Sequence, residues 1–329
     1  MSISFVFVGD VKVGEPLARR LTEAGYLAAS DVASADVVLT FCEGQTATED
    51  VYFETNGLVQ ICAEGTYLID LGATTPSFSK EIQAVALVND LHAIDAPLFV
   101  DDPADADVFA HPESLRIFAG GEEDDYQAVL PLLEVLADEV TYLGVAGAGQ
   151  TALAVASLQN AAQIASLMEA DALCRASGVD AVAMMSASAE AGVISGRVRA
   201  LHEAVCQERF DGAFTLEMLM AELTMALAAA DDVDLILPQG EAAQHLLELL
   251  AVIGGSDKGV AALSLIYGEE SACAQHGLDW TRAERVYGDG HDHDHDDDCG
   301  CGHHHDDEDA DYGIEGYDGL GGFGSYSNN

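Results

Sequence analysis

The stretch Ile3-Ser-Phe-Val-Phe-Val-Gly9-Asp-Val-Lys-Val-Gly14 opens the chain and decides how the rest is interpreted. Its β-branched and aromatic run predicts a buried strand over residues 3–8 that ends at Gly9. Apolar residues then recur at helical spacing over residues 14–24, and Gly25 follows as a stop signal. The chain therefore begins with a strand, a glycine turn and a helix.

The alternation of strand and helix continues to about residue 142. Residues 36–41 form a continuous apolar run, which is typical of a parallel strand buried on both faces. Further strands are predicted at residues 67–71, 92–95 and 117–120, with helices at residues 77–88 and 124–137. Because short loops join these segments, we expect an open parallel sheet with helices on both faces.

The second half of the chain has a different pattern. Residues 150–177 keep helical spacing without a breaker, which predicts a helix of roughly 40 Å. More helices are predicted at residues 180–191, 196–206, 216–230, 240–253 and 259–276. We therefore divide the chain into an α/β domain (1–146), an all-helical domain (147–286) and a tail (287–329).

The chain is strongly acidic, with 58 Asp and Glu against 12 Lys and Arg and a formal net charge of −46. Such a field disfavours nucleic acid and anionic membranes, and weakly disfavours a dinucleotide. Solubility or a salty cytoplasm explains the charge as well as a specific partner would. The start of the chain lacks the basic segment and cleavage site of a signal peptide, so we expect a cytoplasmic protein.

Several motifs carry a resemblance to the β-hydroxyacid dehydrogenases, a family that includes 3-hydroxyisobutyrate dehydrogenase. They are Phe7-Val-Gly-Asp-Val-Lys-Val-Gly14, Asn56-Gly-Leu, Tyr67-Leu-Ile-Asp70, Thr75-Pro-Ser-Phe-Ser-Lys80, Asp95-Ala-Pro97, Phe118-Ala-Gly-Gly121 and Gly144-Val-Ala-Gly-Ala-Gly149-Gln150. The resemblance covers residues 1–285. It implies a Rossmann-like domain that binds NAD(P), a long interdomain helix and an all-α domain that forms a homodimer.

The cofactor fingerprint departs from the family pattern. A Rossmann turn needs a second glycine so that the backbone can approach the pyrophosphate, but Val11 stands between Gly9 and Gly14. The two glycines serve either a dinucleotide or only the tight turn and helix packing. The candidate cofactor-binding residues are Gly9, Gly14, Asp31 and Thr74.

The family's second strand and helix are also missing after Gly25. One interpretation is a deletion that removes the adenosine side of the site. The other is that residues 26–30 form the second strand and that Asp31, 22 residues after Gly9, binds the ribose. We favour the deletion, because no helix fits between Asp31 and Val37 and a parallel crossover needs about a dozen residues.

The resemblance places apolar residues where the family performs its chemistry. Phe99-Val-Asp101 stands in place of the Ser-Gly-Gly turn that binds the substrate carboxylate, so Asp101 should repel an anion. Leu153 occupies the position of the catalytic lysine, and Ala221 that of a second lysine. Ala156 and Ser157 replace an amide pair. No catalytic residue is therefore assigned; the remaining candidates, Asp101, Thr74, Ser157 and Gln159, are weak acids or bases at neutral pH.

The tail combines imidazoles, thiols and carboxylates. Imidazole and thiolate are preferred ligands of nickel, zinc, copper and cobalt, and nearby carboxylates raise the local cation concentration. The tail is similar to those of nickel-handling maturation proteins and is predicted to be disordered unless a ligand orders it. The candidate metal ligands are His291, His293, His295, Cys299, Cys301, His303, His304 and His305.

Three functions follow from these observations. The first is a catalytically degenerate dehydrogenase-like protein that binds, delivers or stores a transition metal, with nickel or zinc expected and a metalloenzyme as possible client. The second is an active NAD(P)-dependent oxidoreductase with an altered substrate and altered catalytic groups. The third is a non-catalytic scaffold for a partner enzyme. We favour the first, because four independent positions have lost their polar group.

Overall fold

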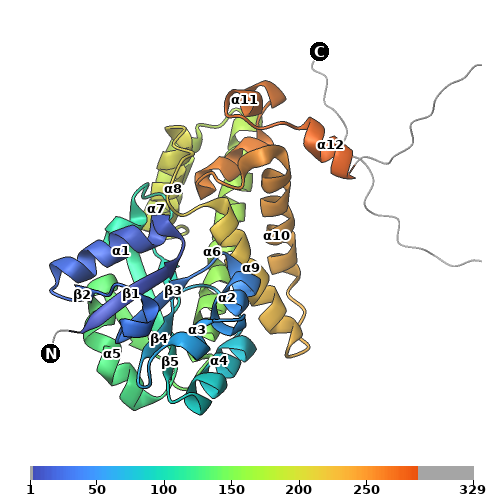
Figure 1. Ribbon diagram of the computed structural model, residues 1–329. Helices are drawn as coiled ribbons and strands as arrows, with labels where there is room; N and C mark the ends of the chain where they lie inside the picture. Colours follow the sequence, from blue (N-terminus) through green and yellow to red (C-terminus); the bar gives the residue numbers. More distant parts are fainter. Residues whose placement is uncertain (1–2, 288–329) are drawn as a thin grey trace, which may run out of the picture. The chain divides into compact units, whose positions relative to one another are not determined.

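The computed structural model describes residues 3–287 and places a five-stranded sheet in the N-terminal half (Figure 1). All its strands are parallel, as the sequence pattern predicts, and they run in the order β2-β1-β3-β4-β5. They are β1 (Ser4–Gly9), β2 (Leu27–Ala28), β3 (Val37–Phe41), β4 (Tyr67–Asp70) and β5 (His92–Asp95).

Successive residues of the central strand face opposite sides of the sheet, and helices cover both sides. Leu39 belongs to the core that includes α1 and α5, whereas Val38 packs in a second core with α2, α3 and α4. These helices are α1 (Val11–Glu23), α2 (Gly44–Phe53), α3 (Leu58–Ile61), α4 (Pro76–Val88) and α5 (Glu123–Leu136). The predicted sheet with two helical layers is confirmed.

A second sheet departs from the purely parallel arrangement that we predicted. The strand β6 (Leu98–Val100) pairs antiparallel with β7 (Leu115–Ala119), which pairs parallel with β8 (Glu139–Tyr142). The short 3₁₀ turns η2 (Val108–Ala110) and η3 (Pro112–Ser114) lie between β6 and β7. The connection from β6 to β7 holds only these two short turns and no α-helix, and β7 pairs antiparallel with β6.

The edge of the first sheet is abbreviated. The strand β2 contains two residues, pairs with β1 through Ser4 and Leu27, and is followed by the 3₁₀ turn η1 (Val32–Ser34). Eight residues then separate β2 from β3 on the other side of β1. Each interpretation of this region is therefore right in part, because a strand lies in the second position but no helix follows it.

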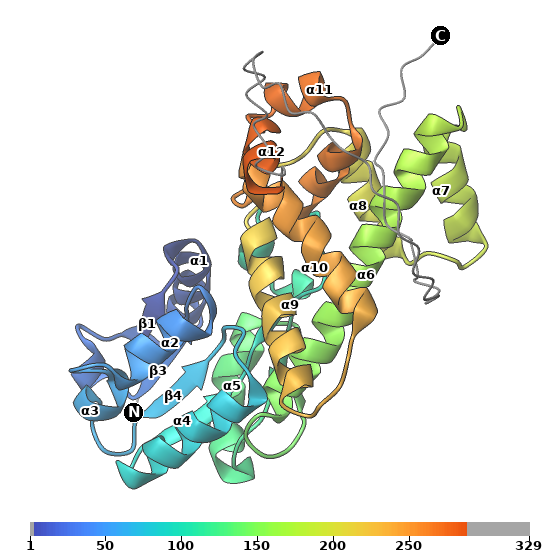
Figure 2. The same cartoon turned by 90° about the vertical axis from the view of Figure 1, so that its right-hand side faces the viewer.

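The C-terminal half of the described chain is helical, and α6, α9 and α10 pack side by side (Figure 2). Its elements are α6 (Ala148–Ala176), α7 (Ala181–Glu190), α8 (Gly196–Cys206), α9 (Leu216–Asp231), α10 (Pro238–Leu250), η4 (Ala251–Gly255), η5 (Val260–Tyr267), α11 (Glu270–Gln275) and α12 (Thr281–Tyr287). The single helix predicted at residues 259–276 is wrong, because Gly268, in an extended conformation, separates η5 from α11. No helix in residues 3–287 is long and apolar enough to cross a bilayer.

The long helix is anchored at its start to the sheet. The amides of Gly147 and Gln150 donate to the Asp95 carboxylate at 2.8 and 3.0 Å, and this carboxylate is buried. Gly147 has φ 85°, and a Cβ there would lie 2.6 Å from the carbonyl oxygen of Pro76. Gly147 is the N-cap of α6. The division of the chain between residues 146 and 147 stays a prediction.

Candidate functional site

A cleft of about 310 Å³ lies where β1, β3 and β4 end and where α9 faces them. In open α/β sheets, ligands bind beyond the carboxyl ends of the strands. We call this space the α9 cleft. It is lined by Asp10, Lys12, Phe41, Cys42, Glu43, Gly44, Leu71, Ala73, Leu98, Leu153, Thr215, Glu217, Met218, Met220, Ala221, Glu222, Thr224 and Asp257.

The two candidate glycines of the first turn are required by packing. Gly9 has φ 124°, and a Cβ on it would lie 1.9 Å from the carbonyl oxygen of Phe41. A Cβ on Gly14 would lie 2.3 Å from the ring of Phe7. The turn and the contact between α1 and β1 therefore explain both glycines without any ligand.

An acidic group occupies the start of α1. The Asp10 carboxylate caps the helix by accepting from the Lys12 amide at 2.6 Å. A helix N-terminus attracts anions through its free amides and its dipole. A capping carboxylate occupies one of these amides and offsets part of the positive end of the dipole, so less attraction is left for a bound anion. The Val11 side chain, where the family has a glycine, is 64% exposed beside this cap. Lys12 brings one positive charge to the cleft.

Asp31 and Thr74 lie outside the cleft wall. Asp31 follows β2, is exposed, and accepts from the Ser34 amide at 3.0 Å. Hydrogen bonds from Ser34 and Ser30 lower the pKa of this carboxyl, so it remains ionised. Thr74 is buried, and its hydroxyl donates to Asp70 at 3.3 Å while its amide donates to Gln150 at 3.0 Å. Ala73 lines the cleft instead.

The positions predicted to have lost their catalytic groups do lie at the cleft. Leu153 is 3% exposed and lines it from α6, and Ala221 lines it from α9. Ser157 is buried one turn further along α6. Neither Leu153 nor Ala221 carries a group that can transfer a proton, as the sequence resemblance implies for these positions.

Glu222, an ionisable group in the same wall, was not predicted from the sequence. Glu222 is 7% exposed, and its Oε2 accepts from the Ser157 hydroxyl at 2.7 Å. Burial raises the pKa of this carboxyl to about 7, while the Ser157 hydrogen bond and the charge of Arg197 oppose that rise. The available signal was its spacing, because Glu222 falls on the apolar face of α9 between Leu219 and Leu223.

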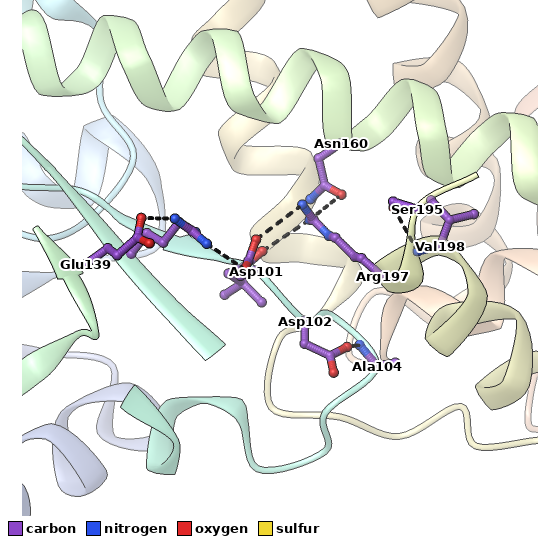
Figure 3. Close-up of polar contacts among 10 residues, drawn as sticks. Asp101, Asp102, Ala104, Glu139, Asn160, Ser195, Arg197 and Val198 are labelled. Carbon is purple, nitrogen blue, oxygen red and sulfur yellow. Dashed lines mark hydrogen bonds and ion pairs between the residues drawn. The ribbon is translucent and has the colours of Figure 1, made fainter. Parts of the chain in front are cut away.

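The prediction for Asp101 is corrected by the structure (Figure 3). Its carboxylate lies 3.2 Å from Arg116 Nη2 and 4.0 Å from Arg197 Nη1, so it is compensated rather than an unopposed negative charge. Arg197 also donates to Asn160 Oδ1 at 2.6 Å and lies 5.0 Å from the ring centre of Phe99. This cluster joins β6, α6 and the start of α8.

Two further buried acids, Asp70 and Asp95, lie outside the cleft wall. Asp70 accepts from Gly72 and Thr40 at 3.2 and 3.1 Å, and burial raises its pKa to about 7. Burial also raises the pKa of Asp95 to about 6, against the amides that it accepts from at the start of α6. Neither lines the α9 cleft. Their contacts tie β4 and β5 to α6, which is a positioning role.

The metal prediction concerns another part of the chain. Within residues 3–287 no group of three or more His, Cys, Asp or Glu residues is placed to hold a metal ion. All the predicted ligands from His291 to His305 lie outside the described residues.

Two family models match most of the described residues. Residues 12–144 match the NAD binding domain of 6-phosphogluconate dehydrogenase. Residues 147–267 match the family described as the NAD-binding part of NADP-dependent 3-hydroxyisobutyrate dehydrogenase. The two matches meet at the start of α6.

Curated relatives cover most of the chain at low identity. An uncharacterized oxidoreductase of Bacillus subtilis is 28% identical over 229 residues, which is 70% of this chain and 78% of the relative. The 2-hydroxy-3-oxopropionate reductase of Escherichia coli is 27% identical over 75% of this chain and 79% of its own length. The mitochondrial 3-hydroxyisobutyrate dehydrogenase of Mus musculus is 25% identical over 80% and 87%.

Solved structures agree with the fold. The 3-hydroxyisobutyrate dehydrogenase of Mycobacterium tuberculosis, solved with L-serine, has a TM-score of 0.70 at 20% identity and covers 82% of this chain and 100% of its own. The order of the two domain matches, the relatives and this likeness agree with one another. The two halves of the chain are therefore similar to the NAD-binding domain of 6-phosphogluconate dehydrogenase and to 3-hydroxyisobutyrate dehydrogenase-like proteins.

Proposed function

We propose that the protein is an NAD-dependent oxidoreductase of the 3-hydroxyisobutyrate dehydrogenase type with an altered substrate and altered catalytic groups. The observation that carries this proposal is the α9 cleft, which lies between the strand ends and α9 and contains a protonatable carboxyl, Glu222. The sequence alone favoured a degenerate protein because four independent positions have lost their polar group. A buried acid in the cleft wall removes that objection.

The residues of the cleft fit a nicotinamide dinucleotide in part. Phe41, Leu71 and Ala73 offer an apolar surface for a nicotinamide ring. Lys12 and the first amides of α1 could meet a pyrophosphate, although Asp10 competes for them. The exposed carboxylate of Asp31, beyond β2, suits ribose hydroxyls and repels a 2′-phosphate, which favours NAD over NADP. When bound, the nicotinamide supplies or accepts a hydride.

The cleft would also control solvent around the reacting atoms. Leu98, Leu153 and Met218 line it with apolar atoms, so a substrate between α9 and the strand ends is shielded from water. Exclusion of water strengthens electrostatic interactions with the reacting groups. The same lining suits a small, partly apolar substrate such as a hydroxyacid or an aldehyde.

Titration of the full chain with NADH and NADPH, followed by cofactor fluorescence, tests this proposal. We expect NADH to bind more tightly than NADPH, and a panel of hydroxyacids and aldehydes to give turnover with one of them. The titration is run in low and in molar KCl, because the acidic surface weakens anion binding at low ionic strength. If neither nucleotide binds at either salt concentration, the proposal fails.

A second proposal concerns the tail and rests on its composition. Eight imidazole and thiol groups between His291 and His305 favour binding of nickel or zinc, with delivery or storage as the use. Calorimetric titration of the full chain and of a chain ending at residue 288 tests it. Metal binding that survives the truncation would refute a tail site. If the protein binds neither nucleotide nor metal, the role as a scaffold for a partner enzyme remains. That the chain forms a homodimer is a separate prediction.

A further inference from the structure

We infer that Glu222 transfers the proton at the reacting oxygen of the substrate, in place of the lysines that the family uses and this chain lacks. The inference rests on the proposed function and names the residue that performs the proton transfer that accompanies hydride transfer. Glu222 occupies the wall of the α9 cleft beside Ala221 and across from the strand ends.

The geometry leaves one carboxyl oxygen of Glu222 for a ligand. Its Oε2 accepts from Ser157, which is buried behind it on α6. The second oxygen has no hydrogen-bond donor within residues 3–287, and the residue keeps 7% of its surface exposed at the cleft. A substrate oxygen beside Leu153 therefore meets a carboxyl whose orientation is fixed from behind. Such fixation is what a proton-transfer group requires.

The protonation state suits transfer in either direction. Burial raises the pKa of Glu222 to about 7, so both the acid and the carboxylate are populated near neutral pH. Arg197 lowers that pKa from the α8 side, and the Cys42 thiol, whose own pKa burial raises to about 11, stays neutral across the cleft. The other charged groups of the cleft wall are Asp10, Lys12, Glu43, Glu217 and Asp257.

Glu222 is distinguished from the other acids of the described cleft wall by burial. Glu43, Glu217 and Asp257 are exposed and Asp10 is committed to the cap of α1. An exposed carboxylate is surrounded by water and is not fixed toward the substrate. Glu222 alone among these five is buried and held by a hydrogen bond from another helix.

The reaction balances with a reduced nicotinamide dinucleotide as the second reactant. In reduction, a hydride reaches the carbonyl carbon, the π electron pair moves to the oxygen, and the Glu222 proton passes to that oxygen. A carboxylate is left, which the Ser157 hydroxyl and the Arg197 charge stabilise until a proton from solvent restores the acid. In oxidation the Glu222 carboxylate accepts the hydroxyl proton while the hydride leaves the carbon for the oxidised nicotinamide.

The decisive experiment compares Glu222→Gln with the wild type and with Glu64→Gln, a matched change at an exposed loop residue outside the cleft. Glutamine keeps the size and the hydrogen bond from Ser157 but cannot donate an acidic proton. We expect NADH affinity within about threefold of wild type and turnover lowered by about 10²- to 10⁴-fold. Glu64→Gln should change neither quantity. Turnover within about threefold of wild type in Glu222→Gln overturns the inference.

A readout that needs no substrate separates this inference from the proposed function. Infrared difference spectra of the free full chain should show a buried carboxyl band that titrates near pH 7 and disappears in Glu222→Gln. If the band is absent, the inference fails even when NADH binds. If the band is present and NADH does not bind, the proposed function fails for a different reason.

Ser157 is a positioning residue for Glu222, and its effect should be on the pH dependence. Ser157→Ala removes the hydrogen bond that lowers the Glu222 pKa, so the infrared midpoint and the pH profile of turnover should move to higher pH. Ser157→Thr keeps the hydroxyl and should restore the wild-type midpoint. A midpoint that does not move in Ser157→Ala contradicts the coupling.

Discussion

Glu222 links the stability of the protein to pH. Its pKa in the folded protein is about 7 against an ordinary 4.5, so the folded state favours the acid. Protonated Glu222 therefore contributes to the unfolding free energy in full below pH 4.5, and this contribution is lost as pH rises through 7. Glu222→Gln should therefore be more stable than wild type at pH 8, by about 3 kcal/mol, and similar at pH 4.5. Urea unfolding of both proteins at the two pH values measures the difference.

The same comparison isolates Glu222 from the other buried acids. Asp70 and Asp95 have raised pKa values in both proteins, so their contribution cancels in the difference. A difference in unfolding free energy that stays constant between about pH 4.5 and pH 8 would show that Glu222 is ionised throughout and would contradict its raised pKa.

Arg197 holds together residues from three elements. Arg197→Met would leave Asp101 with Arg116 alone and would deprive Asn160 Oδ1 of its donor, while Asn160 Nδ2 already has no acceptor within residues 3–287. We expect a loss of about 2 kcal/mol in unfolding free energy. Arg199→Met on the same helix is the control. Its exposed pair with Glu203 should contribute less than about 1 kcal/mol. Equal losses in the two variants would contradict the role of Arg197.

At the residue scale, the sequence predicted the positions without a proton-transfer group better than it predicted the buried acid that lies beside them. Leu153 and Ala221, which the resemblance places at lysine positions, both line the α9 cleft. Glu222 was missed because it is one of 58 acidic residues, and its distinction is burial against Ser157, 65 positions away. The pairing of Asp101 with Arg197, 96 positions on, was hidden for the same reason.

The start of α1 makes a testable prediction at the scale of one element. Asp10→Asn keeps a good helix cap, since Asn and Asp cap equally well, but removes a negative charge from the place where a pyrophosphate would bind. We expect NADH to bind more tightly to this variant, with an unchanged melting temperature. Asp31→Asn is the contrasting variant, because loss of the carboxylate that we propose for the ribose should weaken NADH binding. Fluorescence titration compares both variants with wild type. Binding no tighter in Asp10→Asn, or no weaker in Asp31→Asn, would contradict this placement of the dinucleotide.

Helix and strand positions could be predicted wherever the apolar period is long and undisturbed. The helices α6 and α8 and the strand β5 agree with the predicted ranges to within two residues. The helix α2 was missed because Gly44-Gln-Thr-Ala-Thr has little apolar periodicity and is stabilised by packing through Tyr52. The strand β6 was missed because three residues are too few to show a period, and its pairing with β7 is set by tertiary contacts.

At the scale of the whole molecule, the excess of acidic residues is the property that neither the fold nor the site explains. The net charge is −46, and thirteen of the 58 acidic residues lie in residues 287–329, which contain no Lys or Arg. Most of the repulsion therefore belongs to the part of the chain that carries the sheet and the helices. Self-repulsion of this size opposes a compact state at low ionic strength.

Salt should therefore stabilise the folded protein, and the tail should matter little to that effect. The melting temperature is measured by circular dichroism from about 0.05 to about 2 M KCl for the full chain and for a chain ending at residue 286. The Debye length falls from about 10 Å at 0.1 M to about 3 Å at 1 M, so screening should raise the melting temperature steeply below 1 M and little above it. Because 45 acidic residues remain against 12 basic ones after truncation, the shorter chain should keep most of the rise. If the salt-dependent rise in melting temperature disappears in the shorter chain, the acidic residues of the folded part are already compensated locally, as Asp101 is by Arg116 and Arg197. In that case the net charge of the chain does not describe the electrostatic field that a dinucleotide meets at the α9 cleft.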